Sequence, residues 1–322
     1  MEPRTPASLA AGDAAHARRL ARGFGALVVL VYGLIVLGAL VRSHGAGLAC
    51  PDWPLCFGEW VPRFDFHVAF EWGHRLVAGI VSLLFVGLSA AALSRPGTRR
   101  VTKTGIAVAA TVLAVQIVLG GLTVLHLLAR WTVTSHLLVG NAFAVSLLWL
   151  SCRLAEAGGQ PVRRAPVSGA LRLAVAACAG LLVLQIALGG LVSSSYAGLA
   201  CPDWPTCRDG VWFPGFEGAL GLHLAHRSVG YAVLLALAVA AGLARGAPPL
   251  GRRMALALGV ALVQVALGVA NVWLRIPVEV TALHSAGAAA LVLLLALAVR
   301  DAFAAPRPER HAPVEGLARV EG

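Results

Sequence analysis

Four histidines within long apolar stretches are the residues of this chain that are best suited to chemistry. They form two matched pairs, because His74 in EWGHR corresponds to His226 in HLAHR, and His136 in TSHLLVG corresponds to His284 in ALHSAGA. An ionisable side chain inside a bilayer is costly, so each of these residues is a candidate for function. Two imidazoles that point inward from facing helices of one bundle are what a six-coordinate heme iron requires.

Two other interpretations of the histidines stay open. Zinc is a weaker alternative, because two histidines leave its tetrahedral site half empty unless a carboxylate or a cysteine completes it. A membrane histidine can also be a core residue that only forms hydrogen bonds, but the pairwise recurrence argues against that interpretation. We therefore predict that the four histidines bind heme.

A carboxylate and two arginines accompany the histidines. Glu71 lies one turn before His74 on the same helix face, and His223 occupies its place in the second copy. Glu71 can serve as a general base or charge stabiliser in one copy alone, or it can form an i, i+4 ion pair with Arg75. Arg75 and Arg227 each follow a histidine directly, and can pair with heme propionates or reach lipid headgroups.

Two C-x5-C segments contain the cysteine pairs Cys50–Cys56 and Cys201–Cys207. Both fall in loops that we place on the oxidising side of the membrane, so we expect two disulfides. The closed loops are short, which limits their entropic stabilisation of the fold. The first pair is therefore either a structural staple or an electron-relay dithiol, and the staple is favoured more strongly for the second pair.

The cysteine segments also reveal an internal duplication. Residues 46–56 (AGLACPDWPLC) and 197–207 (AGLACPDWPTC) are identical at ten of eleven positions. QIVLGGLTV at 116–124 recurs as QVALGVANV at 264–272, so the repeat covers most of the chain. Each copy has an even number of predicted spans, which gives both copies the same orientation in the membrane.

The composition excludes a soluble domain, because 58% of the residues are hydrophobic, 13% are charged and the mean hydropathy is +0.80. A bilayer core requires roughly 20 apolar residues per helix. We predict an all-α integral membrane fold of eight transmembrane helices in two like-oriented four-helix bundles. The predicted spans are 24–43, 68–93, 104–126, 132–150, 172–194, 218–244, 254–274 and 279–299.

The net charge of +11 reflects membrane topology and implies no nucleic-acid partner. Of the 26 Lys and Arg residues, 19 lie in segments on the same side as the N-terminus and five on the opposite side. This bias places both termini in the cytoplasm. The predicted divisions are an N-terminal segment (1–22), a first four-helix unit (23–152), a linker (153–171), a second unit (172–300) and a disordered cytoplasmic tail (301–322).

Together these motifs resemble those of the heme A synthase family, membrane enzymes that convert heme O to heme A for terminal oxidases. The resemblance extends from the first span to about residue 300. It rests on E-x-x-H-R at 71–75, H-R at 226–227, His136, His284 and a cysteine pair in each of the first and third outer loops.

The resemblance implies that the two halves have different roles. His226 and His284 would ligate a resident heme b, while His74 and His136 would hold the heme O substrate. Glu71 matches the family's catalytic glutamate. The implied reaction oxidises a porphyrin ring methyl to formyl through an alcohol and a hydrated aldehyde, with heme b as the first electron acceptor.

The expected location is the cell membrane, with the heme sites and cysteine loops toward the extracytoplasmic side. Besides heme O and membrane lipid, the partners compatible with the resemblance are a heme O synthase, a quinone or another electron acceptor, and a second copy of the chain in a homo-oligomer. The main alternative is a di-heme b-type membrane electron carrier without substrate chemistry. The two halves of such a carrier would need the same residues around each heme, whereas Glu71 in the first half corresponds to His223 in the second. A transporter would place polar groups near the membrane midplane.

Overall fold

The chain forms long α-helices joined by loops in the computed structural model, which describes residues 9–160 and 166–304. The eight helices of the described residues are α1 (Ala11–Ser43), α2 (Phe66–Leu93), α3 (Pro96–Leu125), α4 (Arg130–Ala157), α5 (Gly169–Ser194), α6 (Gly218–Leu243), α7 (Leu250–Trp273) and α8 (Val278–Phe303). Each is long and apolar enough to cross a membrane. The predicted all-α, eight-span membrane protein is thus confirmed. Most of the tail predicted at 301–322 lies outside the described residues.

Two helices begin well before the apolar stretches that predicted them. Helix α1 starts at Ala11 inside the segment predicted to precede the first span, and Ala17 and Leu20 are buried in the core of its bundle. Helix α3 starts at Pro96, a residue whose fixed φ suits the first turn of a helix. The predicted spans began only after the basic residues, because a charged side chain is costly in lipid. A basic residue does not prevent a helix from forming, so the helices begin earlier.

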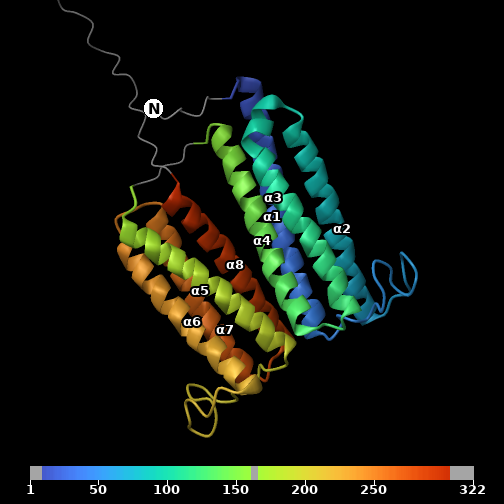
Figure 1. Cartoon of the computed structure of the whole chain (residues 1–322), viewed down its shortest axis with the longest axis vertical. Helices are drawn as coiled ribbons and strands as arrows, with labels where there is room; N and C mark the ends of the chain where they lie inside the picture. Colours follow the sequence, from blue (N-terminus) through green and yellow to red (C-terminus); the bar gives the residue numbers. More distant parts are fainter. Residues whose placement is uncertain (1–8, 161–165, 305–322) are drawn as a thin grey trace, which may run out of the picture.

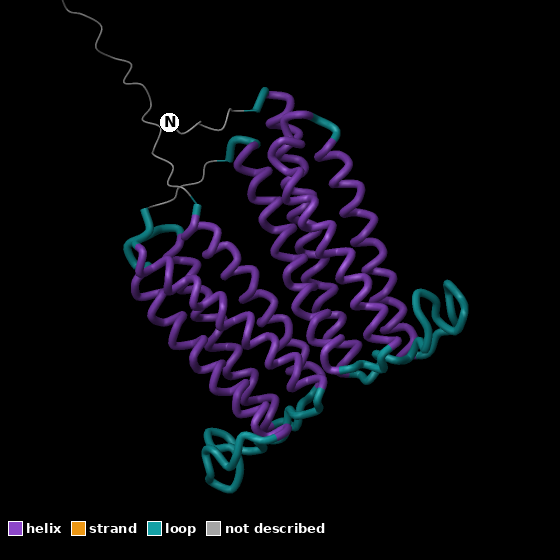
Figure 2. The backbone as a smooth tube through the Cα atoms, in the orientation of Figure 1, coloured by secondary structure: helices purple, strands orange, loops and turns teal. Residues whose placement is uncertain are grey.

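The helices lie in two groups of four (Figure 1), with α1–α4 in one group and α5–α8 in the other. All run along a similar direction, and the two long loops, α1–α2 and α5–α6, emerge at the same end of the molecule (Figure 2). The groups meet mainly through α1, α4, α5 and α8. Trp149 Nε1 donates to the Ala296 carbonyl oxygen at 3.1 Å, and Tyr32 Oη donates to that of Ala286 at 3.1 Å. These bonds satisfy polar atoms between the groups, where no water competes.

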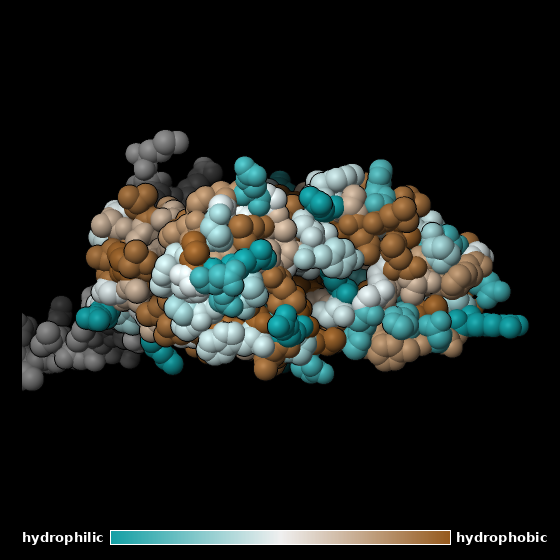
Figure 3. Space-filling model, turned by 90° about the horizontal axis from the view of Figure 1, so that it is seen from below, coloured by the Kyte–Doolittle hydropathy of each residue, from teal (hydrophilic) through white to brown (hydrophobic). Residues whose placement is uncertain are grey.

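Each group has its own hydrophobic core. Phe24, Leu147 and Leu150 are buried in the first, and Leu237 and Leu295 in the second. Many other large apolar side chains are exposed, as expected when lipid is the solvent. At the end of the molecule that carries the long loops, hydrophilic residues are interspersed with apolar ones (Figure 3).

The two long loops are closed by disulfides, Cys50–Cys56 and Cys201–Cys207, as predicted. In the first loop, Asp52 accepts hydrogen bonds from the backbone N–H groups of Gly58 at 2.8 Å and Phe57 at 2.7 Å. The Gly58 N–H, more than any other group, holds the pKa of Asp52 below its ordinary value of 3.8. The charged carboxylate therefore stabilises the loop.

We expect the first loop to lose order as the pH falls through the lowered pKa of Asp52. The stabilisation is complete above the ordinary value of 3.8 and disappears as the folded-state carboxylate takes up its proton. Hydrogen-exchange protection factors of the Phe57 and Gly58 amides should fall on acidification, and in Asp52→Ala they should be low at every pH. Protection that is independent of pH in the wild type would contradict this.

Candidate functional site

The four histidines lie at matching depths near the loop end of the molecule. His74 and His226 are each the ninth residue of α2 and α6, and His136 and His284 are each the seventh residue of α4 and α8. All four helices begin at the loop end. Each group therefore contains one histidine from its second helix and one from its fourth. His74 and His136 thus share one group, and His226 and His284 share the other.

Each imidazole ring lies against a glycine of the preceding helix. A Cβ added to the first three of these glycines would be in tight contact with the ring's Cε1 atom, so the ring would have to shift, and at Gly268 the added Cβ would be in ordinary van der Waals contact with it. The pairs, with the distance from the ideal Cβ to Cε1, are Gly38–His74 (3.1 Å), Gly120–His136 (3.1 Å), Gly189–His226 (3.1 Å) and Gly268–His284 (3.5 Å).

The rings have available nitrogen atoms. The Nδ1 atoms of His74, His136, His226 and His284 are buried and have no hydrogen-bond partner among the described residues. Nε2 of His136 lies 3.2 Å from the Gln116 amide nitrogen. Buried polar atoms normally have partners, so orphaned imidazole nitrogens indicate a group that binds there. Two such rings in each helical group fit the axial ligand set of a heme iron.

A tetrahedral zinc site fits the structure less well. Zinc requires further protein ligands beyond two histidines. Across residues 9–160 and 166–304, no three His, Cys, Asp or Glu side chains gather as a metal site would need. The donor set therefore favours a metal that brings its own equatorial ligands, as a porphyrin does.

Glu71 is buried, with 4% of its surface exposed, and is fastened to the first disulfide loop. Its Oε2 atom accepts a hydrogen bond from the Cys50 backbone N–H at 2.8 Å, and its Oε1 atom accepts one from Arg75 at 2.6 Å. The i, i+4 ion pair considered from the sequence is thus present. Glu71 therefore connects α2, the helix that carries His74, to the disulfide loop that precedes this helix.

His223 takes the place of Glu71 in the second group. Its Nδ1 atom lies 3.3 Å from the Cys201 backbone nitrogen, and its Nε2 atom lies 3.2 Å from Nε of Arg227. A neutral imidazole has one unprotonated nitrogen and can accept from only one of these donors, whereas a carboxylate accepts from both. The second loop is therefore held less completely than the first.

Both arginines bind loop carbonyl groups. Arg75 donates to the carbonyl oxygens of Asp52 at 2.8 Å and Leu55 at 2.7 Å. Arg227 donates to those of Asp203, Thr206 and Cys201 at 2.9, 3.1 and 2.8 Å. The sequence interpretation considered heme propionates and lipid headgroups but did not consider these backbone partners. Pairing with a propionate stays a prediction.

Sequence analysis also missed a set of glutamines. Gln116, Gln185 and Gln264 each stand four residues before a glycine that faces a histidine, and their buried Oε1 atoms have no hydrogen-bond partner among the described residues. Gln185 reaches Nε2 of His226 at 3.4 Å, and Gln264 donates to the His284 carbonyl at 2.7 Å. The signal was the repeated Q-x-x-x-G at 116–120, 185–189 and 264–268.

A family model described as "Cytochrome oxidase assembly protein" matches residues 24–69 and 62–296. The chain belongs to this family. A heme A synthase of Shewanella oneidensis is 31% identical over 314 residues, which cover 83% of this chain and 92% of that protein. A heme A synthase of Methylorubrum extorquens is 28% identical over 334 residues, covering 87% of this chain and 86% of the relative.

A third relative has a different name. A protoheme IX farnesyltransferase of Halobacterium salinarum is 35% identical to this chain over 118 residues, which are 37% of this chain and 26% of that protein. The similarity is thus confined to a part of each polypeptide. A segment related to the cytochrome oxidase assembly family therefore occurs in a protein named for heme farnesylation.

We expect His223→Glu to tighten the second loop. The new carboxylate can accept from both the Cys201 N–H and Arg227, as Glu71 does from the matching donors of the first loop. Hydrogen-exchange protection of the Cys201 amide should rise toward that of Cys50, while Glu71→His should lower protection at Cys50. Unchanged protection in both exchanges would show that the acceptor at this position does not hold the loop.

Proposed function

We propose that this chain is a heme A synthase, which oxidises a ring methyl of heme O to a formyl group. Two heme A synthases whose similarity covers 83% and 87% of this chain support the proposal. The observation that carries it is the pair of histidine sites with orphaned ring nitrogens, only one of which has a carboxylate beside it. Two equal electron-carrying hemes would need no such difference.

The two sites take different hemes in this proposal. His226 and His284 hold a resident heme b, and His74 and His136 hold the heme O substrate. Heme b, when bound, supplies a redox centre that takes one electron at a time. The glycines behind the rings keep each imidazole in position, so the ligands are arranged before either heme arrives.

Glu71 is the catalytic residue of the proposal. It lies three residues before His74 on α2 and therefore on the same side of the helix, so it would adjoin a heme held by that histidine. Oxidation of a methyl carbon breaks C–H bonds, which requires a proton acceptor and stabilisation of positive charge near the ring. Arg75 holds one carboxylate oxygen and fixes its orientation. In the second group, His223 offers no carboxylate.

In the proposed topology, the first unit (23–152) and the second unit (172–300) have the same orientation in the membrane. Both termini lie in the cytoplasm, and the disulfide loops face the extracytoplasmic side. Two closed disulfides at the end of the molecule that carries the histidines support this orientation, because disulfides persist on the oxidising side of a membrane. The basic residues at the opposite end support it as well. The site is then reached from the outer half of the bilayer.

A heme O synthase is the proposed supplier of substrate. The Halobacterium salinarum protoheme IX farnesyltransferase carries a segment similar to this chain within one polypeptide, which supports direct transfer between the two activities. A quinone or another membrane electron acceptor would remove the electrons. A second copy of the chain in a homo-oligomer is a further proposed partner.

Heme analysis of Glu71→Gln tests the proposed activity. Purified protein, produced together with a heme O supply, is extracted, and its hemes are separated by chromatography and identified by mass. The wild type should contain heme A, and the variant should accumulate heme O or its alcohol because the proton acceptor is missing. Heme b alone in both proteins, at both sites, would instead indicate a di-heme electron carrier.

Alanine substitutions of the ligands test the division between the sites. His226→Ala and His284→Ala should lose most of the heme b that purifies with the protein, because a bis-histidine site loses one axial ligand. His74→Ala and His136→Ala should retain it and lose heme O binding. The measurement is heme content per chain together with the low-spin spectrum. Loss of heme b in the first-unit variants would reverse the assignment.

A further inference from the structure

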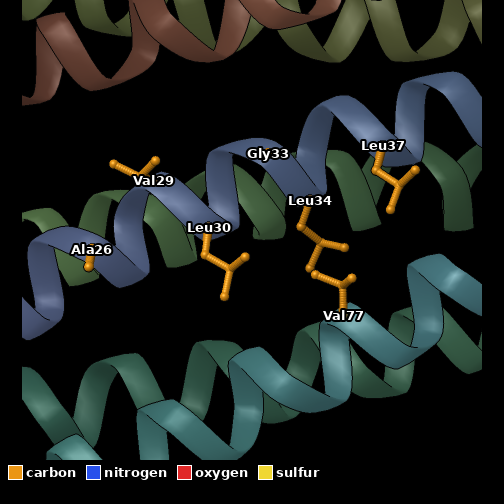
Figure 4. Close-up of a pocket in the computed structure, with 7 residues that line it drawn as sticks. All are labelled: Ala26, Val29, Leu30, Gly33, Leu34, Leu37 and Val77. Carbon is orange, nitrogen blue, oxygen red and sulfur yellow. The ribbon is translucent and has the colours of Figure 1, made fainter.

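An apolar groove runs along the outer face of α1 beside α2 (Figure 4). Its volume is about 420 Å³, within the roughly 300–1,000 Å³ typical of small-molecule sites. The lining contains only hydrocarbon side chains and one glycine: Ala26, Val29, Leu30, Gly33, Leu34, Leu37 and Val77. From residue 26 to residue 37 the helix rises by about 16 Å. The groove therefore suits an extended apolar chain.

The groove adjoins the site around His74. Leu34 stands one turn before Gly38, the glycine against which the His74 ring packs. Val77, on the other wall, comes three residues after His74 on α2. Leu34 and Val77 point toward each other across the groove (Figure 4). An apolar substituent of a molecule bound at His74 would reach the groove directly.

The helix pair α1–α2 differs from the other three at two positions that form the groove. Four residues before the glycine that faces a histidine, α1 has Leu34, whereas the other helices have Gln116, Gln185 and Gln264. Five residues before it, α1 has Gly33, whereas the others have Val115, Leu184 and Val263. A Cβ on Gly33 would meet nothing within 4 Å. The missing side chain opens the groove, and Leu34 lines it with hydrocarbon.

We infer that this groove binds the isoprenoid chain of a farnesylated heme held at His74. The inference rests on the proposed function, because it requires the first group to be the substrate site. A heme without an isoprenoid chain needs no such groove, and α5 has Leu184 where α1 has Gly33. Lipid tails are as apolar as the isoprenoid, so the groove contributes through close packing and selects one heme from another.

Filling the groove tests the inference. Gly33→Leu places in α1 the side chain that α5 carries, in open space and with improved helix propensity, so the fold should tolerate it. Heme O binding, followed by absorbance titration of purified protein, should weaken by about tenfold. Binding of protoheme, which lacks the isoprenoid chain, should not change at the same site. Gly33→Ala should give an intermediate effect on heme O.

Gly259→Leu on α7 is the matched control, because a Cβ at this glycine also meets nothing within 4 Å. It should leave the binding of both hemes unchanged. Equal heme O affinity in the wild type and Gly33→Leu would overturn the inference, as would equal loss of both hemes. A wild type that binds heme O no better than protoheme would overturn it as well, because the groove would then hold a lipid acyl chain as readily as the isoprenoid.

The two proposals fail separately. A wild type that prefers heme O to protoheme, loses that preference in Gly33→Leu and yet forms no heme A would contradict the synthase while supporting the groove. Heme A formation by both the wild type and Gly33→Leu, with identical heme O affinity, would support the synthase and contradict isoprenoid binding in the groove.

Discussion

The contact between a glycine and an imidazole ring is the constraint on which the rest of the structure depends. A histidine inside a lipid-solvated bundle must be kept in one orientation although its Nδ1 atom has no hydrogen-bond partner among the described residues. Here the neighbouring helix approaches the ring at Gly38, Gly120, Gly189 and Gly268. The close approach fixes the spacing of each helix pair. The same glycines therefore determine both how the helices pack and where the imidazole rings lie.

The two halves share this frame and differ in a few side chains around it. Glu71 and His223 occupy the same place, yet only the carboxylate can satisfy both the loop amide and the arginine. Leu34 replaces the glutamine found at the matching place of the second half, Gln185. Both differences lie beside His74. The fold therefore permits two distinct environments on nearly identical scaffolds.

The sequence predicted the helices, the histidine pairs and both disulfides, because each depends on a strong local or repeated signal. Apolar runs require membrane spans, and duplication made the equivalence of His74 and His226 visible. The early start of α1 was missed, because hydropathy reports where lipid ends and does not report where a helix begins.

The partners of Arg75 and the role of the glutamines were missed for another reason. Arg75 binds carbonyls 20 and 23 residues earlier in the chain, and no sequence pattern marks a backbone acceptor. Gln116 was visible as part of a repeat, but its neighbour on another helix could only be known from the packing. Tertiary contacts of this kind have no local signature.

The recurrence of the glycine–histidine contact in all four helix pairs has a consequence for the origin of the chain. One hairpin carries a single ring and is half of a site. Two hairpins joined in series are the smallest polypeptide with two such rings. Duplication of that polypeptide leaves one complete site in place and releases the other from selection. The released copy can then exchange a glutamine for leucine, or keep a carboxylate that its sister lacks, while the other copy retains its pair of rings.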